Sequence, residues 1–183
     1  RIANECYMPF AFGGGIRTVE DVGLVLRSGA EKAVIGTSAV QNPRLIEQSS
    51  KVYGRQSIVV SIDYKQNVFG RRTVYTYSGT KKTDIEPLAM AVDMDLLGAG
   101  EILITSISRE GLGAGLDLDF MSKVTERLEI PVIGGGGVGS VDNILEGITT
   151  SRLSAVAVGS FFTFTGPHRS VLINYPSIPS LQD

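Results

Sequence analysis

Short apolar runs alternate with amphipathic stretches along this chain. The runs are typical of buried strands, and the amphipathic stretches place apolar residues three and four positions apart, as helices do. The pattern predicts strands at 9–12, 33–36, 57–63, 101–106, 131–133 and 155–160, each followed by a helix. Such repeated β-α units indicate a parallel sheet, either a closed barrel or an open doubly wound sheet.

Capping residues place the predicted helices. Thr18 is expected to cap the first of them and Asn42, followed by Pro43, the second. Further helices are predicted from about Asp84 to Leu97 and from about Asp117 to Leu128, with others beginning near Ser140 and at Gly166-Pro167. Residues 68–78 carry a turn and an alternating run, which predicts a two-stranded excursion on a long loop.

An internal repeat decides between barrel and open sheet. Residues 13–20 (GGGIRTVE) match 135–142 (GGGVGSVD), and Gly36-Thr37 matches Gly159-Ser160 at nearly the same offset. Each match follows a predicted strand, so the repeat indicates two halves of four βα units. We therefore expect a (βα)8 TIM-type barrel with a half-barrel repeat, about six of its eight units being present. Residues 1–183 are expected to form a single barrel domain that lacks roughly the first two βα units.

Composition narrows the function classes. The net charge is −2, so the chain shows no basic footprint for nucleic acid, and no apolar run is long enough for a membrane span. One cysteine and one histidine make a metal site with nitrogen and sulfur ligands unexpected. We expect no cofactor, and a reducing, cytoplasmic setting.

The active site of such a barrel lies at the carboxyl ends of its strands. Glycines there let backbone N–H groups approach an anion. Gly13–Gly15 with Gly36-Thr37, and Gly135–Gly137 with Gly159-Ser160, are therefore candidates for two facing phosphate sites that hold a ligand with a phosphate at each end. The alternative is that these glycines only fit tight βα corners.

Charged residues lie at both ends of the predicted strands. Asp63 is the one acid at a carboxyl end, where it is a candidate general acid or base; the alternative is a loop-capping aspartate. Lys32 and Glu101 each lie at the start of a strand, on the opposite side of the barrel. Residues in that position commonly form solvated ion pairs.

Several motifs together resemble the cyclase-type subunit of imidazole glycerol phosphate synthase. They are PFAFGGGIRT (9–18), SIVVSID (57–63), TYSG (76–79), GAGEILITS (98–106) and PVIGGGGVG (131–139). The resemblance implies that ammonia from a glutaminase partner passes through the barrel and attacks a bisphosphorylated ribulosyl ribonucleotide. The products are imidazole glycerol phosphate and an aminoimidazole carboxamide ribonucleotide.

The resemblance also implies roles for individual residues. Asp63 matches one of two catalytic aspartates, and the other belongs to the first strand of the family barrel. Ser78 and Thr105 match positions near the substrate, and Lys32 and Glu101 match half of a charged ammonia gate at the barrel bottom, where the glutaminase docks. Phosphate contacts are implied for Gly15, Thr37, Gly111, Gly136, Gly137, Gly159 and Ser160.

Some positions depart from the cyclase pattern. Ser108 replaces an aspartate, Glu110-Gly111-Leu112 replaces Asp-Gly-Thr, Gly36 replaces Asn and Gly135 replaces Ser. The segment 166–176 is more similar to paralogues from surface-polysaccharide loci, which channel ammonia for amidation of a sugar. Two alternatives to a cyclase therefore stay open: an ammonia conduit without cyclase activity, and a phosphosugar isomerase.

Overall fold

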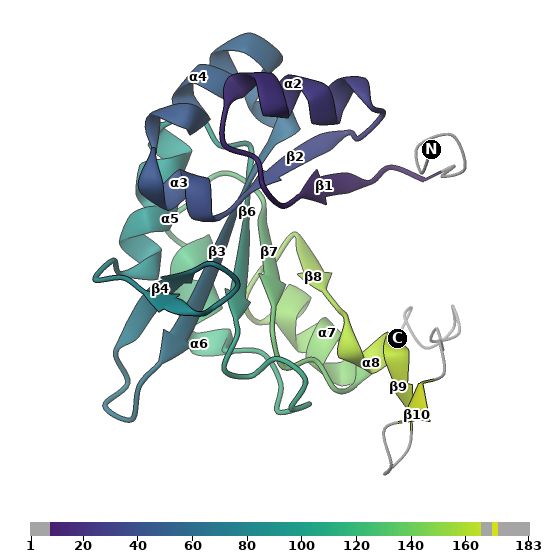
Figure 1. Cartoon of the computed structure of the whole chain (residues 1–183). Helices are drawn as coiled ribbons and strands as arrows, with labels where there is room; N and C mark the ends of the chain where they lie inside the picture. The colour runs from purple at the N-terminus through teal and green to yellow at the C-terminus, as the bar shows by residue number, and fades with distance from the viewer. Residues whose placement is uncertain (1–7, 166–169, 172–183) are drawn as a thin grey trace.

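The computed structural model describes residues 8–165 and 170–171 (Figure 1). Six strands pair in parallel, each with the next, in the order β1-β2-β3-β6-β7-β8. Their bounds are β1 (Ala11–Gly13), β2 (Lys32–Ile35), β3 (Ile58–Gln66), β6 (Glu101–Ser106), β7 (Val132–Gly135) and β8 (Ala155–Ala157). The curved sheet and its alternating helices confirm the fold expected for an incomplete (βα)8 barrel.

Helices follow the strands and cover one side of the sheet (Figure 1). They are α2 (Val19–Arg27), α3 (Thr37–Gln41), α4 (Arg44–Tyr53), α5 (Pro87–Leu96), α6 (Leu118–Thr125), α7 (Val141–Thr149) and α8 (Ser160–Thr163), with a 3-10 turn at Arg55–Ser57. The short helix α3 was not predicted, because five residues of TSAVQ carry no helical periodicity. The helix expected at Gly166-Pro167 lies outside the described residues.

The two faces of β3 show where the core lies. Val60, Ile62 and Tyr64 are fully buried against the helices, whereas the alternate residues Ser61 and Asp63 are only partly buried. Side chains of a strand point alternately to its two faces, so the partly buried set faces the barrel axis. The main hydrophobic core therefore lies between sheet and helices.

The ring is open within the described residues. Strands β1 and β8 are the two ends of the parallel strand order, and each pairs with a single neighbour. An open ring of this kind agrees with the expectation that about six of eight βα units are present. Exposed edges of this kind can add a further strand.

The excursion after β3 differs from the prediction. β3 continues to Gln66 and is itself one arm of the hairpin, pairing antiparallel with β4 (Arg72–Thr76), which in turn pairs with β5 (Lys81–Lys82). The turn between β3 and β4 closes because the Asn67 side chain accepts hydrogen bonds from the N–H groups of Phe69 and Arg71. The barrel strand was predicted too short because its polar end resembles a loop.

The internal repeat is visible in the geometry of two helix starts. Thr18 caps α2, and Asp21 returns hydrogen bonds to the backbone, completing a capping box. Ser140 caps α7 in the same way, and Asn143 accepts the N–H of the residue before the cap, as Asp21 does. The last two glycines of each preceding run have positive φ angles. The two halves therefore share backbone geometry as well as sequence.

The predicted cap at Asn42 is wrong. Pro43 is the residue that precedes α4, and no side chain caps that helix. Asn42 instead closes α3, where its N–H donates to the Ser38 carbonyl. Asp117 precedes α6 but does not cap it, since its carboxylate binds other side chains. Past α8, β9 (Phe164–Thr165) and β10 (Ser170–Val171) form a small antiparallel pair.

Candidate functional site

Asp63 lies near the carboxyl end of the parallel part of β3. It faces Thr105 of β6 on one side and Tyr75 of β4 on the other. Its side chain is partly buried, and this burial raises the pKa of the Asp63 carboxyl above its ordinary value. In the described part of the chain no group donates a hydrogen bond to this carboxylate. A carboxyl group with these properties is suited to accepting and returning a proton.

Asp63 lines a cleft with a volume of about 620 Å³. The cleft brings together seven residues that the sequence singled out, namely Gly13, Gly14, Gly15, Gly36, Thr37, Asp63 and Ser78. The remaining lining comes from Ile16, Arg17, Val34, Ser38, Gln41, Ser61 and Tyr77. The first predicted phosphate site and the predicted acid-base residue thus share one cleft.

The glycine loop of this cleft is free of close packing. Gly14 and Gly15 have φ angles of 109° and 74°, and a Cβ atom added at either would meet nothing within 4 Å. Their backbone is therefore open to the cleft. The amides of Arg17 and Thr18 already bind the Asp21 carboxylate. An anion in this cleft would therefore bind the loop amides that precede Arg17 in the sequence.

The second predicted phosphate site is different. Gly111 and Ser160 line a smaller cleft of about 230 Å³, with Leu112, Gly113, Val138, Gly139, Phe161 and Phe164. Gly159 precedes α8 beside it. At Gly136 and Gly137 an added Cβ would approach the carbonyl oxygens of Ser106 and Gly115 to 2.3 Å. Close backbone packing is therefore enough to require glycine at these two positions.

Thr105 lies between the two sites. Its Cα is paired in register with Asp63 on β3 and with Gly135 on β7. A Cβ at Gly135 would lie 3.3 Å from the Thr105 hydroxyl. The serine that the resemblance implies at this position would therefore contact Thr105 directly.

Lys32 and Glu101 meet as an ion pair. They are the first residues of β2 and β6, and their side chains are 25% and 18% exposed. The pair reaches across β3 at the strand starts, whereas Asp63 lies toward the other end of β3. The two residues therefore do share the bottom mouth of the sheet, as the sequence predicted.

Comparison with known proteins supports the family. A family model described as "Histidine biosynthesis protein" matches residues 1–168. The chain belongs to this histidine biosynthesis family. It is 41% identical over 178 residues to a Vibrio vulnificus (strain YJ016) protein provisionally named an imidazole glycerol phosphate synthase subunit, covering 97% of this chain and 68% of the relative. Two Leptospira proteins with the same provisional name, from L. interrogans and L. borgpetersenii, are each 39% identical over 97% of this chain and 70% of their own length.

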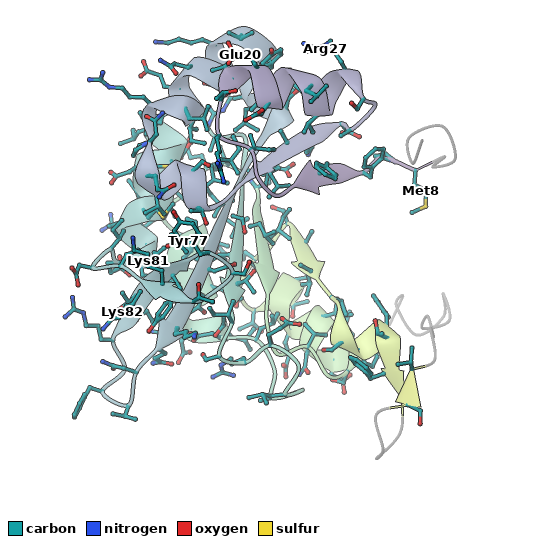
Figure 2. The ribbon with its side chains drawn as sticks, in the orientation of Figure 1. Met8, Glu20, Arg27, Tyr77, Lys81 and Lys82 are labelled. Atoms are coloured by element: carbon teal, nitrogen blue, oxygen red, sulfur yellow. The ribbon has the colours of Figure 1, made fainter. Side chains whose placement is uncertain are left out.

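Tyr77 is a site residue of this histidine biosynthesis family member that the sequence reasoning missed. Its N–H donates to the Thr37 hydroxyl oxygen at 3.0 Å, and its own hydroxyl accepts from the Gln41 amide at 2.8 Å. The TYSG motif drew attention only to Ser78. Figure 2 shows Tyr77 between α3 and the β4 hairpin, with Lys81 beyond it.

A buried polar network on the outer face of β3 was also missed. The Arg72 guanidinium makes two hydrogen bonds to the Asp117 carboxylate, at 2.8 and 2.9 Å, and the Tyr64 hydroxyl donates to the same carboxylate at 3.0 Å. Arg72 also lies 4.7 Å from the centre of the Phe120 ring. Burial alone would raise the pKa of Asp117, but the hydrogen bonds from Arg72 and Tyr64 outweigh it and lower that pKa.

The described residues of this family member contain neither a candidate metal site nor a candidate membrane-spanning helix. Residues 8–165 and 170–171 hold no group of three or more His, Cys, Asp or Glu side chains placed to bind a metal ion. Across the same ranges no helix is both long and apolar enough to span a bilayer.

Proposed function

We propose that this chain is an ammonia-using, cyclase-type synthase subunit. Its substrate would be a bisphosphorylated ribulosyl ribonucleotide, and its ammonia would come from a glutaminase partner. The observation that carries the proposal is the placement of Asp63, a partly buried carboxyl with a raised pKa, in the same cleft as Gly15, Thr37 and Ser78. The names of the relatives support the same reaction class.

Asp63 acts as the acid-base group in this proposal. It takes the proton that ammonia loses on attacking the substrate and returns one as the imidazole ring closes and the second product leaves. Its raised pKa suits both directions of transfer. The amides of Gly14 and Gly15 and the Thr37 hydroxyl hold one phosphate. The partner of Asp63 in acid-base catalysis would come from a strand that completes the ring.

The proposal is tested first by turnover. The full-length protein is incubated with ammonium salt and the ribulosyl ribonucleotide, and imidazole glycerol phosphate is measured. Product formation without any glutaminase supports a cyclase. No product at saturating ammonium, with the protein folded, overturns it.

The ammonia route forms a second part of the proposal. The Lys32–Glu101 pair lies at the bottom mouth. In this proposal it restricts that mouth, and a glutaminase docked over it would deliver ammonia when Lys32 moves. Lys32→Ala should then uncouple glutamine hydrolysis from product formation and spare the ammonium-driven reaction. The control is Lys51→Ala, which removes an exposed ion pair with Glu47 on α4. If Lys32→Ala changes both rates equally, the pair is a surface salt bridge worth about 0–1 kcal/mol.

One observation favours a second candidate, an ammonia conduit without cyclase activity. Much of the wall of the smaller cleft is apolar, formed by Leu112, Val138 and Phe161, and Leu112 stands where cyclases have threonine. A conduit would stimulate the glutaminase and release ammonia, yet leave the ribulosyl ribonucleotide unchanged. The turnover assay above separates the two candidates.

A further inference from the structure

The turn between β4 and β5 has an unusual backbone. Tyr77, Ser78 and Gly79 are consecutive residues with φ angles of 52°, 55° and 79°. Tyrosine and serine rarely adopt this left-handed conformation, which is disfavoured for residues with a Cβ atom. Such a backbone persists only where surrounding contacts hold it. Both Tyr77 and Ser78 line the large cleft, so the constraint lies at the candidate site.

Helix α3 supplies contacts that hold the turn. Thr37 and Gln41 are its first and last residues, four positions apart and therefore on one face of the helix. Thr37 accepts the Tyr77 N–H, and Gln41 binds the Tyr77 hydroxyl. Tyr77 is thus held by hydrogen bonds both at its backbone N–H and at its side-chain hydroxyl.

The hairpin itself completes the restraint. The Lys65 ammonium donates to the Gly79 carbonyl at 3.1 Å, and the Thr80 hydroxyl donates to the Tyr77 carbonyl at 2.7 Å. These contacts come from β3 and from the turn, so they hold its base. Within the described residues, the hydrogen bonds that join the turn to the opposite wall of the cleft come from α3.

The hydrogen bond from the Tyr77 N–H determines how the Thr37 hydroxyl can bind a ligand. Its hydroxyl oxygen accepts from Tyr77, so the hydroxyl proton remains available for donation. Thr37 lines the cleft, where that proton can bind an anionic oxygen. Ser78 is presented to the same cleft by the left-handed turn.

We propose that Gln41 is a positioning residue which, by holding Tyr77, fixes the Thr37 and Ser78 hydroxyls for a phosphate-bearing ligand. This rests on the proposed function for the identity of the ligand. Without the Gln41–Tyr77 hydrogen bond the turn relaxes away from α3. The Thr37 and Ser78 hydroxyls then lose their fixed orientation toward the ligand. The effect falls on ligand binding, since Asp63 is held by β3 independently of the turn.

The test uses Gln41→Ala and Tyr77→Phe in the full-length protein, with Gln48→Ala, an exposed residue of α4, as the control. Each variant removes one neutral hydrogen bond, which corresponds to about a fivefold effect. We expect KM for the ribulosyl ribonucleotide to rise about fivefold with kcat changed less than twofold. The double variant should resemble either single one, because both remove the same bond.

Hydrogen exchange separates failure of this inference from failure of the proposed function. We expect the Tyr77 amide to exchange about fivefold faster in both variants, while amides of residues 107–115 keep their rates. An active protein whose KM is unchanged in both variants overturns the positioning role and leaves the proposed function standing. If the unmodified protein has no turnover, the proposed function fails. The inference is then decided by inorganic phosphate binding. It is overturned if both variants bind phosphate with the affinity of the unmodified protein, or if no protein binds phosphate at all.

Discussion

Two aspartates near β3 have opposite surroundings. Asp63 belongs to the strand and faces the cleft, without a donor in the described residues. Asp117 lies on the other side of the strand and receives hydrogen bonds from Arg72 and from Tyr64, the residue after Asp63. Burial raises the pKa of Asp63, whereas donors lower the pKa of Asp117 despite burial.

The difference teaches how to separate a reactive carboxylate from a structural one. A buried carboxylate surrounded by donors is stabilised in its charged form and has no capacity left for a substrate. A partly buried carboxylate without donors is held at a cost in folding stability, and its proton is easier to transfer near neutral pH. Neighbouring positions on one strand thus serve the fold and the site separately.

Breaking the Asp117 network should have the largest effect on stability. Arg72→Met leaves the Asp117 carboxylate buried without its bidentate partner, and such a loss typically costs about 3–5 kcal/mol. Urea unfolding measures it. Arg71→Met, at the exposed neighbour, should change stability by less than about 0.5 kcal/mol. An Arg72→Met variant as stable as Arg71→Met would show that the ion pair contributes nothing.

The second-largest effect on stability should come from acid, which weakens the Asp117 network. The pKa of Asp117 is lowered in the folded protein, so its contribution to stability is complete above the unfolded value near 3.8. It is lost as the pH falls below that value through the folded pKa. Thermal unfolding from pH 6 to pH 2 should therefore show a fall below about pH 4 that is reduced in Asp117→Asn. Equal acid sensitivity in the two proteins would place the titrating group elsewhere.

The smallest effect concerns Asp63 and has the opposite sign. A raised pKa in the folded state means that the charged form opposes folding, so stability falls as the pH rises through that pKa. Asp63→Asn should raise Tm at pH 7 by no more than about 2 °C, since about 1 kcal/mol corresponds to about 2–4 °C at this size. Asp93→Asn, on the exposed face of α5, is the control. A lower Tm for Asp63→Asn would assign Asp63 a structural role.

The sequence was informative where signals are local. Apolar runs located the six parallel strands, and the repeated glycine runs located two βα corners with shared geometry. The residues Arg72 and Asp117 lie 45 positions apart, and nothing in their local patterns joins them. The same holds for Gln41 and Tyr77, which meet only because α3 packs beside the β4 turn. Polar contacts between distant segments depend on the finished fold.

The roles of the two glycine sites could not be separated from sequence. Both runs have the same letters, but Gly15 faces open space and Gly137 faces a carbonyl oxygen of another loop. The distinction comes from the loop after β6, which packs on the second run; the first run has no such covering in the described residues. A motif repeated in sequence is therefore free to bind a ligand in one half and confined by packing in the other.

The most direct test of the account is the ammonium-driven turnover of Asp63→Asn in the full-length protein. A group acting in acid-base catalysis contributes about 10²–10⁴-fold, so kcat should fall by that factor. Binding of a bisphosphate ligand should stay nearly intact, because the cleft keeps its glycine loop and hydroxyl groups. Turnover at the unmodified rate would contradict the assignment of Asp63 and favour the conduit.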